Sequence, residues 1–327
     1  MHFLLLLLPS SSSLTFHSLV RQKLTSSAFT NVERVIESWD CINEGYHHKE
    51  ILDPAHPTSM VQEARSYLPG LTAKPFWSPS DSLFAQELAS SYLVIREEFD
   101  KVTAISNSKN LAKGNNVWAT AADSKSAASY GPDWKTLVLN DRTTYDSTNS
   151  LLFPKTVSIL KNLTGTPVVE AFFASMEPNS SINLHSDSCN FILTSHLGLD
   201  IPGNGNECRL SVGDTTQNWK DGEVMLFDTS IMHSAVNETP KTRYILMLRV
   251  WHPELTSSEI KALQFTFDAL DVPGILSESA GERFIAEEQL RVLRSGEGAV
   301  PNPPPTTIPT PSKKSKKSAT VIKRGFG

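Results

Sequence analysis

Short runs of β-branched and aromatic residues, separated by Gly, Pro, Asn and Asp, fill the second half of this chain. They cover residues 134–139, 168–176, 191–199, 208–212, 224–227 and 243–251. Runs of this length between turn-forming residues predict antiparallel strands, and so many of them close into a small sandwich or barrel. The sequence therefore predicts an α+β fold with a mainly β core.

Helical patterns lie on both sides of these runs. Apolar residues recur at steps of three and four at Phe84, Leu88, Tyr92, Ile95 and Phe99. This spacing gathers side chains on one helical face and predicts an amphipathic helix that packs on the core. Downstream, the capping-box spacing of Thr256 and Glu259 opens a helix, and a second helical pattern covers 282–294.

The chain divides by composition into five segments. Residues 1–30 are predicted to be a leader or a disordered segment, and residues 31–133 a mainly helical region that packs on the core. The β core is assigned to residues 134–255 and the C-terminal helices to 256–300. Residues 301–327 are rich in proline and lysine, so they are predicted to form a disordered tail.

Composition argues against several classes of protein. A formal charge of −5 leaves no folded basic surface for a polyanion, so no nucleic acid is expected as a partner. The three cysteines are too few and too scattered for a disulfide framework or a thiolate zinc site. No run of about 18 apolar residues occurs, so no transmembrane span is expected.

The two ends of the chain carry signals for location. Residues 3–8 form a short apolar block like the core of a secretory signal peptide, and residues 26–29 resemble the junction of a plastid leader. A disordered N-terminus on a cytoplasmic protein is the alternative. The lysines of the tail allow a weak contact with an anionic surface, although a solubilising role is commoner for such clusters.

An H-x-D pair and one distant histidine form a candidate metal centre. His185 and Asp187 follow a predicted strand, and side chains two residues apart in an extended chain point to the same side. With His233 from a neighbouring strand, they would make the two-histidine, one-carboxylate triad of non-haem Fe(II) oxygenases. Taken alone, this pair is a weak signal, and a surface turn is the alternative.

Arg243 begins the strand pattern of residues 243–251 and strengthens this candidate. Alternation places Arg243, Ile245 and Met247 on one face, which directs a guanidinium among apolar residues. A buried guanidinium needs an anion, and a dicarboxylate would pair with it through two parallel hydrogen bonds. An ordinary surface ion pair at the strand end is the alternative.

Several motifs, in order along the chain, resemble the aspartyl/asparaginyl β-hydroxylase family. They are residues 68–77, 153–156, 185–199, 219–228, His233 and 243–255. The resemblance implies a double-stranded β-helix, which is a cupin-like jelly roll, with iron near its open mouth. It implies that His185 and His233 bind the iron. It also implies that Arg243 grips the far carboxylate of 2-oxoglutarate and that His196 contacts this cosubstrate.

Three positions depart from the family pattern. Asp187 stands where the best-known animal members have glycine, and in this respect the chain resembles bacterial lipid-modifying relatives. Thr194 stands where the animal enzymes have an arginine near the cosubstrate. Ala174 replaces a serine, for which the neighbouring Ser175 is a candidate substitute. These changes concern cosubstrate geometry and substrate identity rather than the reaction class.

The implied activity is hydroxylation of an aspartyl or asparaginyl side chain in a peptide or protein. Fe(II) is the implied cofactor, 2-oxoglutarate and O₂ are the cosubstrates, and succinate and CO₂ are released. A hydroxylase of a lipid or small acid remains an alternative. A non-catalytic jelly-roll binding module and a metal enzyme that does not use 2-oxoglutarate are the others.

Other residues near these motifs have simpler interpretations. Trp219 and Gly222 are predicted to form a hairpin turn rather than part of the site. Asp228 is predicted to order the loop that carries His233. Cys189 is predicted to be a small buried side chain, and His252, beside a proline, a structural corner.

Overall fold

The computed structural model of the protein describes residues 12–109, 119–120, 133–142, 144–165 and 168–295. The predicted tail at 301–327 and the apolar block at 3–8 lie outside these described residues. Among the residues that are described, no helix is both long and apolar enough to cross a membrane.

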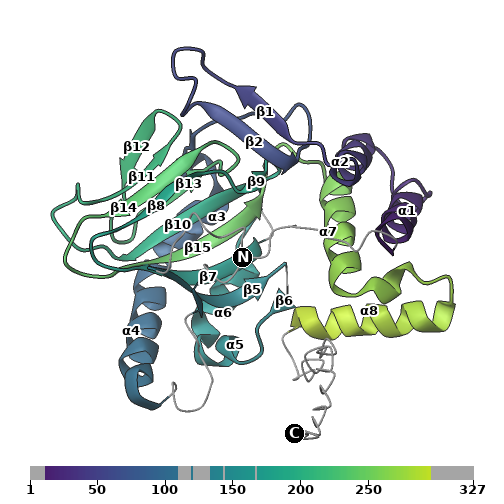
Figure 1. Cartoon of the computed structure of the whole chain (residues 1–327). Coiled ribbons are helices and arrows are strands. Elements are labelled where there is room, and N and C mark those ends of the chain that lie inside the picture. The colour runs from purple at the N-terminus through teal and green to yellow at the C-terminus, as the bar shows by residue number, and fades with distance from the viewer. Residues whose placement is uncertain (1–11, 110–118, 121–132, 143, 166–167, 296–327) are drawn as a thin grey trace, which may run out of the picture.

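The core of the molecule consists of two antiparallel sheets that face each other (Figure 1). The larger sheet has the order β3 (Phe76–Trp77), β13 (Val224–Phe227), β10 (Ile192–Asp200), β15 (Arg243–Trp251), β7 (Val168–Met176), β5 (Trp134–Asp141) and β4 (Ala119–Thr120), with β6 (Thr144–Tyr145) paired to β5. The smaller sheet has the order β12 (Thr215–Asn218), β11 (Cys208–Val212), β14 (His233–Asn237) and β8 (Ser180–His185). This arrangement is a double-stranded β-helix, or jelly roll, and confirms the predicted fold class.

The strands of the larger sheet separate two apolar layers. In β15, Ile245 and Met247 face the smaller sheet and pack between the two sheets. Leu246 and Leu248 face the other way, into a cluster that the helices cover. The covering helices are α3 (Leu83–Ser90), α4 (Tyr92–Lys109) and α6 (Pro154–Asn162), with the short α5 (Asn149–Leu152) and the 3-10 turn η1 (Pro79–Asp81) beside them. The alternation predicted for β15 is therefore confirmed, and its inner face looks into the jelly roll.

The helix predicted from the spacing of Phe84 to Phe99 is interrupted. α3 ends at Ser90 and α4 begins at Tyr92. The hydroxyls of Ser90 and Ser91 both donate to the carbonyl oxygen of Glu87, which offers the backbone an alternative to a continuous helical ladder. Phe84 and the other predicted core residues of this stretch are buried, and only Tyr92 is half-buried, so the two shorter helices still present one apolar face.

The N-terminal part of the chain corrects one prediction. α1 (Ser12–Leu24) packs against α2 (Glu33–Asn43), and its Val20 and Leu24 are fully buried. His17 of α1 stacks on Trp39 of α2 at 5.2 Å between ring centroids, and the Trp39 indole N–H donates to the carbonyl oxygen of His17. Residues 12–24, which were assigned to a leader or disordered segment, are therefore helical and packed, so the alternative of disorder is wrong for them and that of a leader stays a prediction.

The region predicted to be mainly helical also contributes strands. β1 (His48–Ile51) and β2 (Val61–Ser66) form a hairpin, and β9 (Ser188–Cys189) adds to β2 in parallel. These strands were missed because exposed or charged residues interrupt their apolar alternation. The hairpin touches the loop before β14, where Gln62 donates to the Ser230 hydroxyl at 2.9 Å.

The C-terminal helices join the N-terminal ones on one side of the jelly roll (Figure 1). They are α7 (Ser257–Asp271), the 3-10 turn η5 (Pro273–Leu276) and α8 (Ala280–Ser295). The capping box at the start of α7 is present, because the Thr256 hydroxyl accepts from the Glu259 N–H and the Glu259 carboxylate accepts from the Thr256 N–H.

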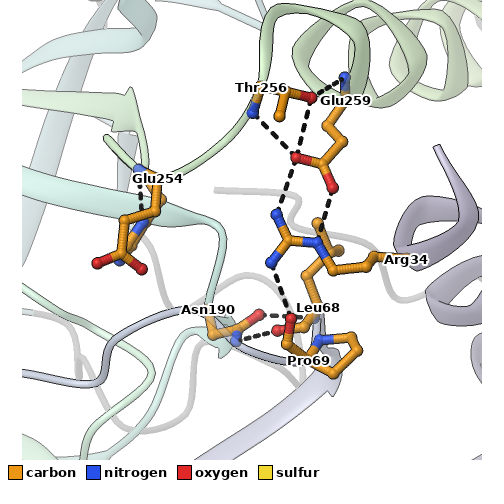
Figure 2. Close-up of polar contacts among 8 residues, drawn as sticks. Arg34, Leu68, Pro69, Asn190, Glu254, Thr256 and Glu259 are labelled. Atoms are coloured by element: carbon orange, nitrogen blue, oxygen red, sulfur yellow. Dashed lines mark hydrogen bonds and ion pairs between the residues drawn. The ribbon is translucent and has the colours of Figure 1, made fainter. Parts of the chain in front are cut away.

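Two groups of polar contacts hold these helices and residues 68–69 in place (Figure 2). Arg34 of α2 binds both carboxylate oxygens of Glu259, at 2.7 and 2.9 Å, and donates to the carbonyl oxygen of Pro69. Asn190 accepts from the Leu68 N–H at 2.8 Å and donates to the Leu68 carbonyl oxygen at 2.9 Å. Asn190 directly follows β9, so it anchors the strand that comes after the candidate metal loop.

Replacement of Asn190 by alanine is expected to lower the free energy of unfolding by about 2–4 kcal/mol, because it leaves a buried N–H and a buried C=O of Leu68 without partners. Urea denaturation measures this loss. The control is Asn162→Ala, which removes an exposed hydrogen bond and is expected to change the free energy by less than about 0.5 kcal/mol. An Asn190→Ala protein as stable as wild type contradicts this account of the Asn190 contacts.

Candidate metal centre

The three predicted ligands meet at one end of the jelly roll. His185 ends β8, His233 begins β14, and these two residues are directly paired in the antiparallel ladder. Asp187 lies in the short loop between β8 and β9. One ligand atom from each residue lies within 4.8 Å of the other two, and Nε2 of His185 is 3.7 Å from Oδ1 of Asp187. Two imidazoles and a carboxylate therefore converge as the sequence predicted.

Backbone carbonyls orient both imidazoles. Nδ1 of His185 is 2.7 Å from the carbonyl oxygen of Asn183, and Nδ1 of His233 is 2.9 Å from that of Ile231. Because a carbonyl oxygen only accepts, each Nδ1 carries a proton and each Nε2 keeps its lone pair for a metal. Burial, together with the nearby His185, lowers the pKa of His233 to about 4, so this imidazole is neutral at pH 7.

Asp187 is held by a residue that the sequence analysis did not identify. Its Oδ2 accepts a 2.6 Å hydrogen bond from Nη1 of Arg249, and its backbone N–H donates to the carbonyl oxygen of Thr229 at 2.8 Å. Arg249 is fully buried in β15 on the same face as Arg243. The alternation that singled out Arg243 reaches Arg249 three steps later, so the signal for this residue was present in the sequence.

A cavity with aromatic walls opens beside the three ligands. Its walls include Trp134, Trp219 and Phe227, and its polar lining includes Thr194, His196 and Thr229. Thr194 of β10 faces this cavity and donates to the Thr229 hydroxyl at 3.5 Å. The prediction that Trp219 belongs to a turn and not to the site is wrong, because Trp219 is buried in the cavity wall.

Arg243 lies against the two tryptophans of this wall. Its Cζ is 4.3 Å from the ring centroid of Trp219 and 5.2 Å from that of Trp134. The residue is fully buried, and among the described residues its Nε and Nη1 have no hydrogen-bond partner, while Nη2 contacts Sδ of Met176 at 3.4 Å. Desolvation lowers the pKa of this guanidinium to about 9. Burial of a cation without a hydrogen-bond acceptor is unfavourable, so this position would favour the binding of an anion.

The orientation of His196 follows from Trp219. The indole Nε1–H donates to Nδ1 of His196 at 3.2 Å, so Nδ1 is an acceptor and Nε2 carries the proton. Burial and the charge of Arg243 lower the pKa of His196 well below its ordinary value, so the ring is neutral. Its buried Nε2 has no hydrogen-bond partner among the described residues, which leaves an N–H donor at the cavity.

The structure contradicts the suggestion that Ser175 substitutes for the missing serine. In the β7–β15 ladder, Arg243 pairs with Met176 and Tyr244 pairs with Ser175. Paired residues of antiparallel strands share a face, so Ser175 lies with Tyr244 on the outer side of the sheet. Ala174 has the inner position and lies in the apolar layer between the sheets. A sequence neighbour cannot replace it, because successive side chains of a strand point to opposite faces.

Three structural roles predicted from the sequence are confirmed. Asp228 accepts from the N–H and hydroxyl of Ser230, at 2.9 and 2.6 Å, and so orders the loop before His233. Cys189 is buried, and desolvation raises the pKa of its thiol to about 12, which suits packing rather than reactivity. His252 contacts the carbonyl oxygen of Thr72 at 3.2 Å through Nε2 and holds the corner after β15.

Comparison with known proteins adds to this geometry. The family described as Aspartyl/Asparaginyl beta-hydroxylase matches residues 89–253, about half of the chain. This match covers most of the jelly roll, the three candidate ligands and Arg243.

Three individual relatives match between 53% and 77% of this chain. The chain is 26% identical over 214 residues to the human aspartyl/asparaginyl beta-hydroxylase, covering 64% of this chain and 26% of the human one. It is 27% identical over 264 residues to aspartate beta-hydroxylase domain-containing protein 2 of Xenopus tropicalis, covering 77% and 67%. It is 26% identical over 174 residues to an ornithine lipid ester-linked acyl 2-hydroxylase of Rhizobium tropici, covering 53% and 59%. The chain thus spans about a quarter of the length of the human relative.

Proposed function

This chain belongs to the aspartyl/asparaginyl β-hydroxylase family, and on that premise we propose that it is an Fe(II)- and 2-oxoglutarate-dependent dioxygenase. Its substrate in this proposal is an aspartyl or asparaginyl side chain of a peptide or protein. The observation that carries the proposal is a three-ligand cluster together with a fully buried Arg243, two of whose nitrogens have no hydrogen-bond partner in the described part of the chain.

The donor set fits a ferrous ion. Two imidazoles and one carboxylate are the ligands of the facial triad, and the backbone contacts at Nδ1 leave Nε2 of His185 and His233 as donors. Bound there together with 2-oxoglutarate and O₂, iron would supply the oxidising power that places a hydroxyl on a carbon, with succinate and CO₂ released.

The protein's own side chains orient the cosubstrate. Arg243 would neutralise the far carboxylate of 2-oxoglutarate through the Nε and Nη1 groups that have no partner among the described residues. His196 would donate its Nε2–H to an oxygen of the same molecule. Trp134 and Trp219 flank the guanidinium and exclude water from this pair, which strengthens its electrostatic attraction.

Release of succinate from 2-oxoglutarate tests the proposal. The purified protein is incubated under air with Fe(II), 2-oxoglutarate and a library of peptides that contain aspartate or asparagine. Succinate equimolar with a peptide heavier by one oxygen is the expected result. Absence of succinate in every reaction, from protein shown to be folded, is evidence for a non-catalytic module.

One observation favours a second candidate, which is hydroxylation of a lipid acyl chain. Asp187 completes a triad that resembles the acidic H-x-D pattern of bacterial lipid-modifying relatives, and one similar protein is an ornithine lipid acyl 2-hydroxylase. The same assay with vesicles that contain an acylated amino-acid lipid distinguishes the two. A hydroxylated acyl chain with unmodified peptides would assign the enzyme to lipids.

Trp219→Phe is expected to weaken the binding of 2-oxoglutarate about 5- to 10-fold. An aromatic ring remains beside Arg243, but the loss of the indole N–H frees the tautomer of His196, at a cost of about 1 kcal/mol. Calorimetric titration of the Mn(II)-loaded protein with 2-oxoglutarate measures the change.

The matched control for this change is Trp251→Phe. Trp251 is equally buried but lies in the cluster beneath α7, stacked on Phe267. This variant is expected to lose some stability and to bind 2-oxoglutarate as wild type does. Equal affinities in Trp219→Phe and wild type would rule out the assigned role of the indole N–H.

A further inference from the structure

The two oxygens of Asp187 have different partners. Oδ2 accepts from Nη1 of Arg249 at 2.6 Å, whereas Oδ1 lies 3.7 Å from Nε2 of His185. The hydrogen bond from the Asp187 N–H to the carbonyl oxygen of Thr229 fixes the main chain at the same point. One oxygen is therefore engaged by a cation, and the other is turned toward the imidazoles.

Arg249 is itself held in place on several sides. It sits within β15, where the ladders pair it with Glu170 of β7 and with Thr194 of β10. Its Nε is 3.7 Å from Oε2 of Glu170, and its Nη2 donates to Sγ of Cys189 at 3.9 Å. A planar guanidinium with contacts at Nε, Nη1 and Nη2 has little freedom to rotate, so it presents Nη1 to Asp187 in one direction.

The two arginines on the inner face of β15 have different surroundings. Its inner face carries Arg243 and Arg249, with the apolar Ile245 and Met247 between them. Both arginines are fully buried, but among the residues that the structure describes only Arg249 has a carboxylate within hydrogen-bond distance. A buried ion pair contributes little net stability compared with apolar residues of the same size. The pair between Arg249 and Asp187 therefore calls for an explanation other than stability.

We propose that Arg249 is the positioning residue of the metal centre. By occupying Oδ2 of Asp187, it restricts this carboxylate to a single ligand oxygen and directs that oxygen to the metal. A carboxylate that binds through one oxygen leaves one more coordination position for cosubstrates than a bidentate one. This inference rests on the proposed function, because it concerns the same iron site.

Titration of the metal-free protein with Co(II) tests this role without turnover, because the visible spectrum of bound Co(II) reports its coordination. Arg249→Met is expected to bind Co(II) about 10- to 100-fold more weakly and with an altered spectrum, as is typical when a partner of a ligand is lost. Arg249→Lys retains a positive charge and is expected to recover part of the affinity. In an Asp187→Gly background, Arg249→Met is expected to cause no further loss beyond about twofold.

Arg34→Met is the matched control. Like Arg249, Arg34 binds a carboxylate, but this carboxylate is that of Glu259 in α7, which Arg34 contacts through two nitrogens. Removal of Arg34 is expected to leave Co(II) binding unchanged. A folded Arg249→Met protein with wild-type Co(II) affinity and spectrum overturns the inference. The inference is also overturned if Arg249→Met lowers Co(II) affinity as much in the Asp187→Gly background as in the wild-type background. Should Arg249→Met not fold, Arg249→Lys compared in the two backgrounds decides the same question.

The wild-type titration separates this inference from the proposed function. If the wild-type protein binds no Co(II) or Fe(II), both the proposed function and the role of Arg249 fall. If it binds metal and the Arg249 variants behave as wild type, only the positioning role is overturned.

Discussion

His233→Ala is expected to lower the affinity for Fe(II) by more than about 100-fold and to abolish succinate release. The substitution removes one of the three candidate ligands. Loss of a residue that only contacts a ligand typically lowers metal affinity 10- to 100-fold, so loss of a ligand itself is expected to lower it more. Anaerobic Fe(II) titration gives the affinity, and succinate assayed under saturating metal gives the activity.

The matched control is His252→Ala. His252 is as deeply buried as His233, but it binds the carbonyl oxygen of Thr72 at the corner after β15. Its loss is expected to lower stability and to leave Fe(II) affinity unchanged. Wild-type Fe(II) affinity in His233→Ala would remove this histidine from the ligand set.

Arg243→Met is expected to weaken the binding of 2-oxoglutarate and to stabilise the metal-free protein. Two charge-assisted hydrogen bonds to 2-oxoglutarate are lost, at about 1.5–3 kcal/mol each, so the affinity falls roughly 100- to 1,000-fold or more. The metal-free protein is expected to become more stable by about 1–3 kcal/mol, because an apolar side chain replaces a buried cation that has no carboxylate partner within the described ranges of the chain. Calorimetric titration and urea denaturation measure the two effects.

Arg209→Met provides the comparison for Arg243→Met. Arg209 pairs with Glu238 on the surface, at 2.6 and 2.7 Å, so its replacement is expected to change stability by less than about 1 kcal/mol and cosubstrate binding not at all. If Arg243→Met binds 2-oxoglutarate as tightly as wild type, the guanidinium is not its anchor.

The central strands were predictable because their buried faces leave a local signal. The predicted runs at 168–176, 208–212, 224–227 and 243–251 coincide with β7, β11, β13 and β15. β8 and β12 were missed, because the side chains of these strands are mostly exposed and polar, and an exposed strand lacks apolar alternation. β14 was missed as a strand even though the role of His233 required one.

The site was predictable only in part, because local spacing leaves a signal in the sequence and contacts between distant residues do not. The two-residue spacing of His185 and Asp187 is a local property and allowed both to be assigned to one ion. Alternation along β15 could have placed Arg249 on the inner face, but its contact with Asp187, which is 62 residues away in sequence, forms only in the folded protein. Trp219 was misjudged because the turn that follows it is local, whereas its contact with His196 joins two different strand regions.

The residues of this chain alone predicted most strands of the larger sheet, three candidate ligands for a cation and the strand that carries a buried guanidinium. Tertiary structure decided the rest: that His233 pairs with His185 across the ladder, that Ser175 faces away from the cavity, and that Arg249 holds Asp187. Periodicity along a chain records which face of an element is buried. The partner that it meets there depends on strand register and on the packing of two sheets, which no local pattern encodes.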